Sequence, residues 1–252
     1  MNRGAGDDLA DGAGDDLADG AGDDMADTWV VVPMHYEESV VGDVVTDLRR
    51  SFRNVVCVDD GSRDASAAVA AAAGARVVRH PVNLGQGAAL QTGIEFALLD
   101  PRDRYLVTFD ADGQHRVADA VRMVELLRTG SYDVVLGSRF LGDATGLTAG
   151  RRLLLRAAAA LTRVTAGIAV TDAHNGLRAM TRDFAERLDI TMAGMAHASE
   201  ITEAVGRLGA RWVEVPVTID YTDYSRAKGQ RSINSVNIAF EISVHQLFGG
   251  RR

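Results

Sequence analysis

Asp110 and Asp112 are the side chains of this sequence best suited to chemistry, because they stand one residue apart directly after an apolar run. That run, LVTF at 106–109, has the composition of a buried strand, and Gly113 permits the chain to turn just beyond it. Both carboxylates can then reach one cation, and Gln114 offers a third oxygen. Hard divalent cations such as Mg²⁺ prefer oxygen ligands of this kind together with substrate phosphates. The pattern therefore predicts a divalent-cation site that neutralises a diphosphate leaving group.

An Asp-x-Asp pair can also be ordinary turn chemistry, and taken alone that interpretation is the stronger one. Two more pairs of acidic residues favour the cation site over an ordinary turn. Glu37 and Glu38 follow the first predicted strand, and Asp59 and Asp60 end the second. Carboxylates gathered at one edge of a sheet repel one another unless a positive charge joins them. Their shared position therefore favours the cation site.

Apolar strands alternate with helices through the first part of the chain. The predicted strands are 29–33, 54–60, 75–80, 104–110 and 132–139, and the predicted helices are 40–52 with Ser39 as its cap, 65–73, 85–99 and 117–129. Strands that are apolar throughout and alternate with helices are typical of a parallel sheet covered on both faces. Right-handed crossovers bring the carboxyl ends of such strands to one edge, where ligands bind. We therefore expect an α/β fold with a mostly parallel sheet and helices on both faces.

The alternation stops after Arg139. Residues 150–168 are predicted to be helical, with arginines among leucines and alanines, and 197–208 form a further helix. Residues 211–219 alternate like a half-exposed strand, and 233–248 carry one apolar helical face. We expect one nucleotide-type core with a different C-terminal third, rather than two independent domains.

Three copies of an eight-residue Gly/Asp/Ala unit occupy residues 4–27 and carry nine aspartates. Together with Arg3 they account for the net charge of −8, because acids and bases balance in residues 28–252. A segment of this composition cannot bury enough apolar surface to fold. A solvated tail is favoured over a Ca²⁺-binding repeat. The predicted organisation is a disordered acidic tail over 1–27, a catalytic domain over 28–232 and an amphipathic helix over 233–252.

Several functional classes lack their signatures in this sequence. Cys57 is the single cysteine and lies within VVCVDD, which indicates a buried core thiol and a reducing cytoplasm. No run of about 18 apolar residues occurs, so no membrane span is expected, and the tail does not resemble a signal peptide. No Gly-rich dinucleotide or phosphate-loop motif is present, and no Gly-x-Ser-x-Gly elbow. The six histidines have no metal-ligand spacing.

Six motifs in order, followed by an Arg-Ser pair, resemble the family 2 glycosyltransferases of the GT-A fold. Among these the sequence is most similar to polyprenyl-phosphate (dolichol-phosphate) mannose or glucose synthases. The resemblance covers about residues 29–235 and rests on VVPMHYEES, VVCVDDGSRDAS, HPVNLGQGAALQTG, FDADGQH, LGSRF, DAHNGLRAM and Arg231-Ser232. His35 and Tyr36 replace the Tyr-Asn of the family, and Gln86 stands where many members have Lys.

The resemblance implies a role for each matching residue. Nucleotide binding is expected of Pro33, His35, Glu37, Asp59, Asp60 and Asp110. Mg²⁺ or Mn²⁺ is expected at Asp110, Asp112 and Gln114. The acceptor or its phosphate is expected at Arg139, Arg151, Asp172, Arg178, Arg226, Arg231 and Ser232. The residues expected to act in catalysis are Asp112, Arg139 and Glu200.

The acceptor decides which further chemistry is needed. A sugar hydroxyl requires a carboxylate to remove its proton, for which Glu200 is the candidate. A lipid phosphate is already ionised and needs cations instead, and arginine matches phosphate oxygens in a bidentate fork. The expected reaction is inverting transfer of a hexose, mannose first, from GDP-mannose or UDP-glucose to polyprenyl phosphate. The alternatives are a soluble transferase with a hydroxyl acceptor and a non-catalytic nucleotide-sugar-binding subunit.

A membrane surface or a membrane partner protein is a further expected contact. The helix predicted over 150–168 is equally consistent with arginines facing anionic headgroups and with an ordinary solvated face. The terminal helix is better explained by core packing. The protein is expected in the cytoplasm, peripheral on the inner face of the cell membrane if the acceptor is a lipid, and no nucleic-acid partner is expected.

Overall fold

The computed structural model describes residues 25–141, 144–145, 168, 170–194 and 196–220. Residues 1–24, with most of the acidic repeats, lie outside the described residues, as do nearly all of the predicted helix 150–168 and the C-terminal helix. Residues 25–27 were expected in the tail, but they pack on the core. Met25 is buried, and Asp27 pairs with Arg128. The packed part of the chain therefore includes three residues that the predicted boundary assigned to the tail.

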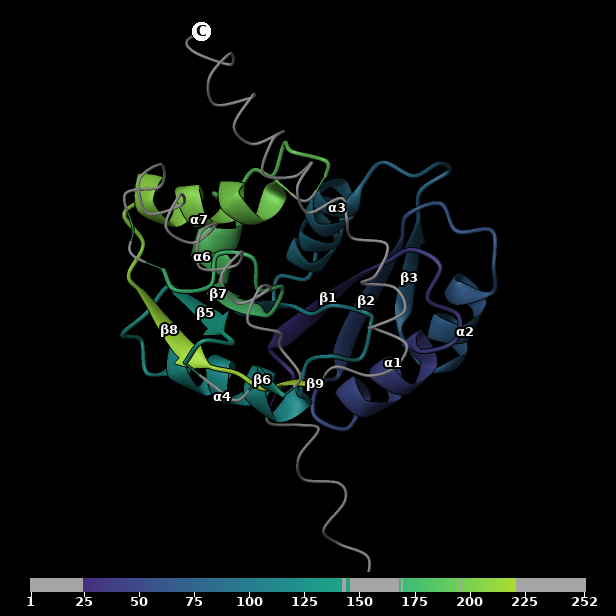
Figure 1. Ribbon diagram of the computed structural model, residues 1–252, viewed down its shortest axis with the longest axis horizontal. Coiled ribbons are helices and arrows are strands. Elements are labelled where there is room, and N and C mark those ends of the chain that lie inside the picture. Colours follow the sequence, from purple (N-terminus) through teal and green to yellow (C-terminus); the bar gives the residue numbers. More distant parts are fainter. Residues whose placement is uncertain (1–24, 142–143, 146–167, 169, 195, 221–252) are drawn as a thin grey trace, which may run out of the picture.

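A seven-stranded sheet in the order β3-β2-β1-β4-β7-β5-β8 forms the centre of the fold (Figure 1). The strands are β1 (Thr28–Met34), β2 (Asn54–Asp59), β3 (Arg76–Arg79), β4 (Tyr105–Thr108), β5 (Val134–Ser138), β7 (Arg178–Thr181) and β8 (Trp212–Pro216). β1 runs parallel to β2 and β4, β2 to β3, and β5 to β8. The mostly parallel α/β sheet predicted from the sequence is confirmed, and its first five strands lie where they were expected.

β7 runs antiparallel between β4 and β5. The sequence reasoning did not identify this strand. It is only four residues long and begins with the buried Arg178, so neither its length nor its pattern resembles the apolar strands before it. Its pairing places Arg178 beside Thr108 of β4 and Leu136 of β5.

Helices cover both faces of the sheet, as expected. On one face lie α1 (Val41–Arg49), α2 (Ser66–Ala72) and α4 (Val117–Arg128), and on the other lie α3 (Gln86–Leu98), α6 (Arg182–Ala185) and α7 (His197–Arg207) (Figure 1). β1 shows how the strands serve both layers. Val30 and Val32 pack into the first layer, and Trp29 and Val31 into the second. Burial raises the pKa of Cys57, on β2, to about 12, which confirms a core thiol.

Two local predictions were wrong in detail. Ser39 does not cap α1; the helix begins at Val41, and the Glu37 carbonyl accepts the N–H groups of Val40 and Val41 instead. The strand predicted over 211–219 is divided into β8 and the short β9 (Ile219–Asp220), which pairs with β6 (Ala144–Thr145).

Gly93 lies inside α3 because the helix approaches β1 too closely for a side chain there. A Cβ at this position would lie 3.2 Å from Val58 Cγ2 and closer still to Val31 Cγ1. The close packing brings the amino end of α3 to the edge of the sheet where β1, β2 and β4 end.

Candidate functional site

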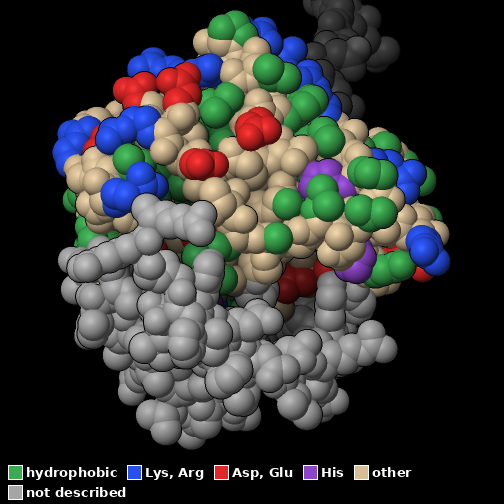
Figure 2. All heavy atoms as spheres, turned by 90° about the horizontal axis from the view of Figure 1, so that it is seen from above, with side chains coloured by type: hydrophobic (Ala, Val, Ile, Leu, Met, Phe, Trp, Pro, Cys, Tyr) green, Lys and Arg blue, Asp and Glu red, His purple; other side chains and the backbone are tan. Residues whose placement is uncertain are grey.

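A cleft of about 800 Å³ opens at the carboxyl edge of the sheet. Strand ends, the amino end of α3 and the segment before α7 contribute to it. Its lining residues are Pro33, Met34, His35, Glu37, Asp60, Asn83, Gly85, Gln86, Ala89, Asp110, Ala111, Asp112 and Gly194. Figure 2 looks onto the side that carries α3, α6 and α7, where acidic side chains are visible in a recess of the surface. Six of the predicted site residues therefore share one cleft.

Asp110 is held from three directions. Its Oδ2 accepts a hydrogen bond from His115 Nε2 at 3.0 Å, and its Oδ1 accepts one from Gln86 Nε2 at 3.3 Å. The third contact is the backbone of Gly176, where a Cβ would lie 2.5 Å from the Asp110 Cγ. Three elements far apart in the sequence thus define one orientation of this carboxylate.

Asp112 faces the cleft beside Asp110, and Gln114 orients it. The Gln114 backbone N–H donates to Asp112 Oδ1 at 3.1 Å, and its side-chain Nε2 donates to Oδ2 at 2.6 Å. Burial, together with the neighbouring Asp110 charge, raises the pKa of Asp112 to about 6. Burial also opposes ionisation of Asp110, but the hydrogen bond from His115 and the charge of Arg178 hold the pKa of Asp110 below its ordinary value.

This pair of carboxylates fits a divalent cation. Among the described residues no group of three or more His, Cys, Asp or Glu side chains could hold a metal ion. Mg²⁺ commonly takes only one or two protein carboxylates and completes its shell with water and substrate phosphates. Asp110 and Asp112 supply that number of carboxylates. The raised pKa of Asp112 comes from its burial and from repulsion by Asp110, and a bound cation would offset both.

The two aspartates at the carboxyl end of β2, Asp59 within the strand and Asp60 just after it, shape the loops around the cleft. Asp60 lines it, and its carboxylate accepts the N–H groups of Leu84 and Gly85 and a hydrogen bond from His80. Burial alone would raise the pKa of Asp60, but these three hydrogen bonds lower it. Asp59 is fully buried, lies outside the lining and accepts from the Ser62 N–H and from Arg79.

Pro33, His35 and Glu37 come from the end of β1 and the turn after it, on the cleft wall. His35 Nε2 accepts from Asn83 Nδ2 at 3.1 Å, and Glu37 is buried. Tyr36 between them has φ of 58°, an uncommon conformation for a residue other than glycine, and its backbone N–H donates to the Ser62 hydroxyl at 2.9 Å. Pro33, His35 and Glu37 share the cleft with Asp110 and Asp112, and nucleotide binding by these three side chains stays a prediction.

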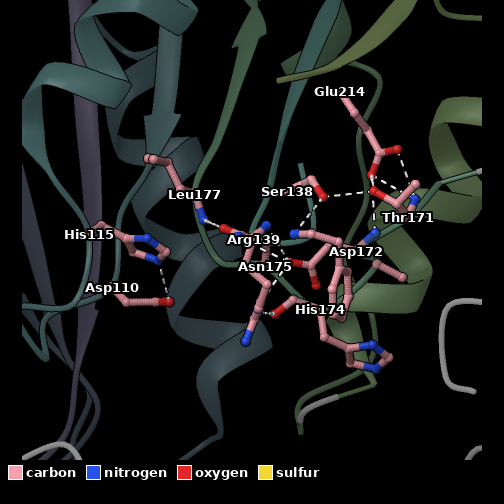
Figure 3. Close-up of polar contacts among 12 residues, drawn as sticks. Asp110, His115, Ser138, Arg139, Thr171, Asp172, His174, Asn175, Leu177 and Glu214 are labelled. Carbon is pink, nitrogen blue, oxygen red and sulfur yellow. Dashed lines mark hydrogen bonds and ion pairs between the residues drawn. The ribbon is translucent and has the colours of Figure 1, made fainter. Parts of the chain in front are cut away.

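A second polar cluster lies at the end of β5 (Figure 3). Asp172 Oδ2 accepts from Arg139 Nε at 2.6 Å and from the Arg139 backbone N–H at 3.0 Å. Glu214 on β8 accepts from the Thr171 N–H and hydroxyl and from the Asp172 N–H. Asn175 Nδ2 also donates to Asp172, at 3.3 Å. The Arg139 guanidinium is thereby oriented through Asp172, but it does not line the cleft.

Arg178 is a buried cation between the two clusters. Its side chain is within electrostatic range of both Asp110 and Asp172, and burial lowers its pKa to about 10. One guanidinium nitrogen, Nη1, has no hydrogen-bond partner among the described residues, and Nη2 donates to the Ala173 carbonyl at 3.4 Å. A buried unpartnered cationic nitrogen is costly, so the site has capacity for one more anionic oxygen.

The remaining predicted residues are not brought to the cleft or cannot be placed. Glu200 lies in the first turn of α7, outside the cleft lining, and its carboxylate accepts hydrogen bonds from the segment at 191–192. Arg151, Arg226, Arg231 and Ser232 lie outside the described residues.

His115, Gly176 and Glu214 were missed as site residues by the sequence reasoning. The first two stand inside motifs that were noticed, FDADGQH and DAHNGLRAM, and those motifs were the available signal. Glu214 had no such signal. It lies in a strand that alternates in polarity, where a glutamate is ordinarily solvent-facing.

Two relatives carry names that state a reaction. The UDP-N-acetylglucosamine–dolichyl-phosphate N-acetylglucosaminyltransferase of Methanococcus voltae is 27% identical over 85% of this chain and 92% of its own length. The undecaprenyl-phosphate mannosyltransferase of Micrococcus luteus is 30% identical over 69% of this chain and 75% of its own.

A solved structure shares the fold. Glucosyl-3-phosphoglycerate synthase of Mycobacterium tuberculosis, in complex with Mn²⁺, UDP and glucosyl-3-phosphoglycerate, superposes with a TM-score of 0.63 at 21% identity. The match covers 84% of this chain and 78% of the other. The family model described as glycosyl transferase family 2 matches residues 29–189, which include both clusters except Glu214. The chain is therefore a glycosyltransferase of family 2.

Proposed function

We propose that this enzyme transfers a hexose, mannose in the first instance, from a nucleoside-diphosphate sugar to polyprenyl phosphate with inversion. The observation that carries the proposal is the placement of Asp110 and Asp112 in the same cleft as Pro33, His35 and Glu37. A nucleoside held by the β1 wall would extend its diphosphate toward the acidic pair.

Asp110, Asp112 and Gln114 are the proposed ligands of Mg²⁺ or Mn²⁺. When bound, the ion supplies positive charge opposite the departing diphosphate. The protein contributes the orientation: His115 and Gln86 hold the Asp110 carboxylate, and Gln114 holds that of Asp112. The solved structure with the shared fold contains Mn²⁺ and UDP, which supports a metal and a nucleotide as ligands of this enzyme.

The acceptor phosphate is proposed to bind at the Arg139 and Arg178 side chains. A phosphate oxygen attacks the anomeric carbon without a base, because it is already ionised, and cations hold it in line with the leaving group. Arg178 has an unpartnered Nη1 among the described residues, and Asp172 orients Arg139. Two relatives are named for dolichyl or undecaprenyl phosphate, which supports a lipid phosphate acceptor.

The place of action follows from the acceptor. No helix within the described part of the chain has the length and apolarity to span a bilayer. We propose a cytoplasmic enzyme that works at the inner face of the cell membrane, where polyprenyl phosphate presents its headgroup.

Incubation with Mn²⁺ or Mg²⁺, polyprenyl phosphate and labelled sugar donors tests the proposal. GDP-mannose, UDP-glucose and UDP-N-acetylglucosamine are the donors to compare, since the two relatives differ in their sugar. Lipid-soluble label from one donor, lost on chelation, is expected. Label only in water-soluble sugar products would establish a hydroxyl acceptor, and tight donor binding with no transfer or hydrolysis would indicate a non-catalytic subunit.

A further inference from the structure

The carboxylate of Glu200, the candidate base, is occupied by hydrogen bonds from the nearby segment at residues 191–192. Its oxygens accept the Thr191 N–H at 3.0 Å, the Thr191 hydroxyl at 2.6 Å and the Met192 N–H at 2.9 Å. A carboxylate that accepts several such hydrogen bonds has few lone pairs left with which to contact an acceptor hydroxyl. The contacts also tie α7 to the segment 191–194 that precedes it.

The segment 191–194 lies against the amino end of α3 with no space between them. The Gly87 N–H donates to the Ala193 carbonyl at 2.9 Å. A Cβ on Gly85 would lie 2.7 Å from the Ala193 carbonyl carbon, and one on Gly87 would lie 3.1 Å from that of Met192. Both glycines are therefore required by the close approach, and a shift of the segment would move the start of α3.

The two segments together form one wall of the cleft. Gly194 lines it from one segment, and Gly85 and Gln86 line it from the other. Gln86 in turn donates to Asp110 Oδ1. A continuous series of contacts therefore leads from Glu200, through the carbonyls at 192 and 193, to the Asp110 carboxylate.

Glu214 shows the same arrangement at the other cluster. It accepts the N–H and the hydroxyl of Thr171 and the N–H of Asp172, just as Glu200 accepts those of Thr191 and Met192. In both places a glutamate binds a threonine and the next backbone amide of a loop that borders the site. The repetition of the pattern indicates a structural device for holding loops.

We propose that Glu200 is a positioning residue of the glycosyl transfer and not its proton acceptor. It clamps 191–194 against the start of α3 and so maintains the cleft wall and the contact of Gln86 with Asp110. The inference rests on the proposed function, and it deepens it: an enzyme whose candidate base is occupied in this way fits an acceptor that needs no base.

Glu200→Gln and Thr191→Val separate the two roles. Thr191→Val removes one donor to the clamp and leaves the Glu200 carboxylate in place, so it impairs a clamp but not a base. Thr191→Ser restores the hydroxyl, and Glu186→Gln, at an exposed glutamate paired with Arg182, is the matched control. Each variant is compared for affinity toward the nucleoside diphosphate with Mn²⁺, for kcat and KM, and for amide hydrogen exchange.

A clamp predicts that Glu200→Gln and Thr191→Val weaken nucleotide affinity about five- to tenfold, from the loss of charge-assisted hydrogen bonds. The amides of Thr191, Met192 and Gly87 should exchange faster in both. Thr191→Ser and Glu186→Gln should resemble the wild type. A kcat loss above about a thousandfold in Glu200→Gln, with affinity, amide exchange and Thr191→Val all unchanged, would establish a base and overturn the clamp.

The exchange experiment needs no substrate, so it also separates this inference from the proposed function. If the wild type binds none of the nucleotides, the function is refuted while faster exchange at Thr191, Met192 and Gly87 still supports the clamp. If exchange and nucleotide affinity are both unchanged in Glu200→Gln, the clamp is refuted whatever the enzyme transfers.

Discussion

Gly176→Ala should damage the proposed metal site without replacing any of its proposed ligands. The new Cβ would lie 2.5 Å from both Cγ and Oδ1 of Asp110 and closer still to Oδ2, whereas real Cβ contacts below 3.0 Å are essentially unknown. The backbone at 176 cannot easily retreat, because its carbonyl accepts the Thr108 hydroxyl at 2.7 Å and β7 begins two residues later. The Asp110 carboxylate must therefore move by about 1 Å, a displacement that typically costs about a hundredfold in rate.

We expect kcat/KM of the Gly176→Ala variant to fall about a hundredfold, or about 2.7 kcal/mol of transition-state stabilisation. Its affinity for Mn²⁺ in the presence of nucleoside diphosphate, measured by calorimetry, should fall with it. Gly42→Ala is the matched control. Its Cβ would meet only the tip of Val69, at 2.9 Å, where α1 packs on α2, and Gly42 does not line the cleft. Normal Mn²⁺ affinity and turnover in a folded Gly176→Ala protein would refute the idea that the Asp110 orientation depends on this glycine.

Three further changes test separate parts of the structure. Burial raises the pKa of Asp103 to about 7, so the folded state loses stability as pH rises from about 4 to 7. Asp103→Asn should therefore raise Tm by several degrees at pH 8 and clearly less at pH 5. Equal shifts of Tm at the two pH values would contradict this reasoning. Asp112→Asn should lose most of its turnover, and chelation should have the same effect on the wild type. Without metal, the Tm of the variant should equal or exceed that of the wild type, because repulsion with Asp110 is relieved. Wild-type rates in the variant would refute the metal assignment. Arg139→Lys keeps the positive charge but loses the planar guanidinium that Asp172 orients. KM for polyprenyl phosphate should therefore rise about tenfold, with the affinity for the sugar donor unchanged. An unchanged KM for the acceptor would place its phosphate elsewhere.

The architecture was predictable where hydrophobic periodicity carries the information. Apolar strands alternating with helices predicted the parallel core, and the position of the Asp110 pair after such a strand predicted a site at the carboxyl edge. The pattern could not reveal β7, because four residues that begin with an arginine do not have the period or the composition of a buried strand. It also misplaced the start of α1, where backbone hydrogen bonding to Glu37 replaces a side-chain cap.

Individual roles were less predictable than positions. Glu200 was expected at the acceptor because of the family resemblance, with the role of base if the acceptor is a hydroxyl. Its carboxylate instead contacts backbone amides only eight and nine residues earlier in the chain. Gly176 and Asp110 meet across 66 residues of sequence, a contact that no local pattern encodes. The motif resemblance pointed to the segment around Gly176, but only the packing explains why that residue lacks a side chain.

The direction of β7 explains how the two clusters come to share one edge. Parallel strands contribute to a site through the residues that follow them, as β4 does with Asp110 and β5 with Arg139. An antiparallel strand between them begins at that same edge, so it contributes through the residues that precede it and through its first residue. Arg178 opens β7 opposite Thr108 and Leu136, near the ends of β4 and β5, which puts its charge within reach of Asp110 on one side and Asp172 on the other. The carboxyl ends of predicted strands therefore do not include the start of β7, which runs antiparallel to its neighbours in the described sheet and supplies a buried cation to the site.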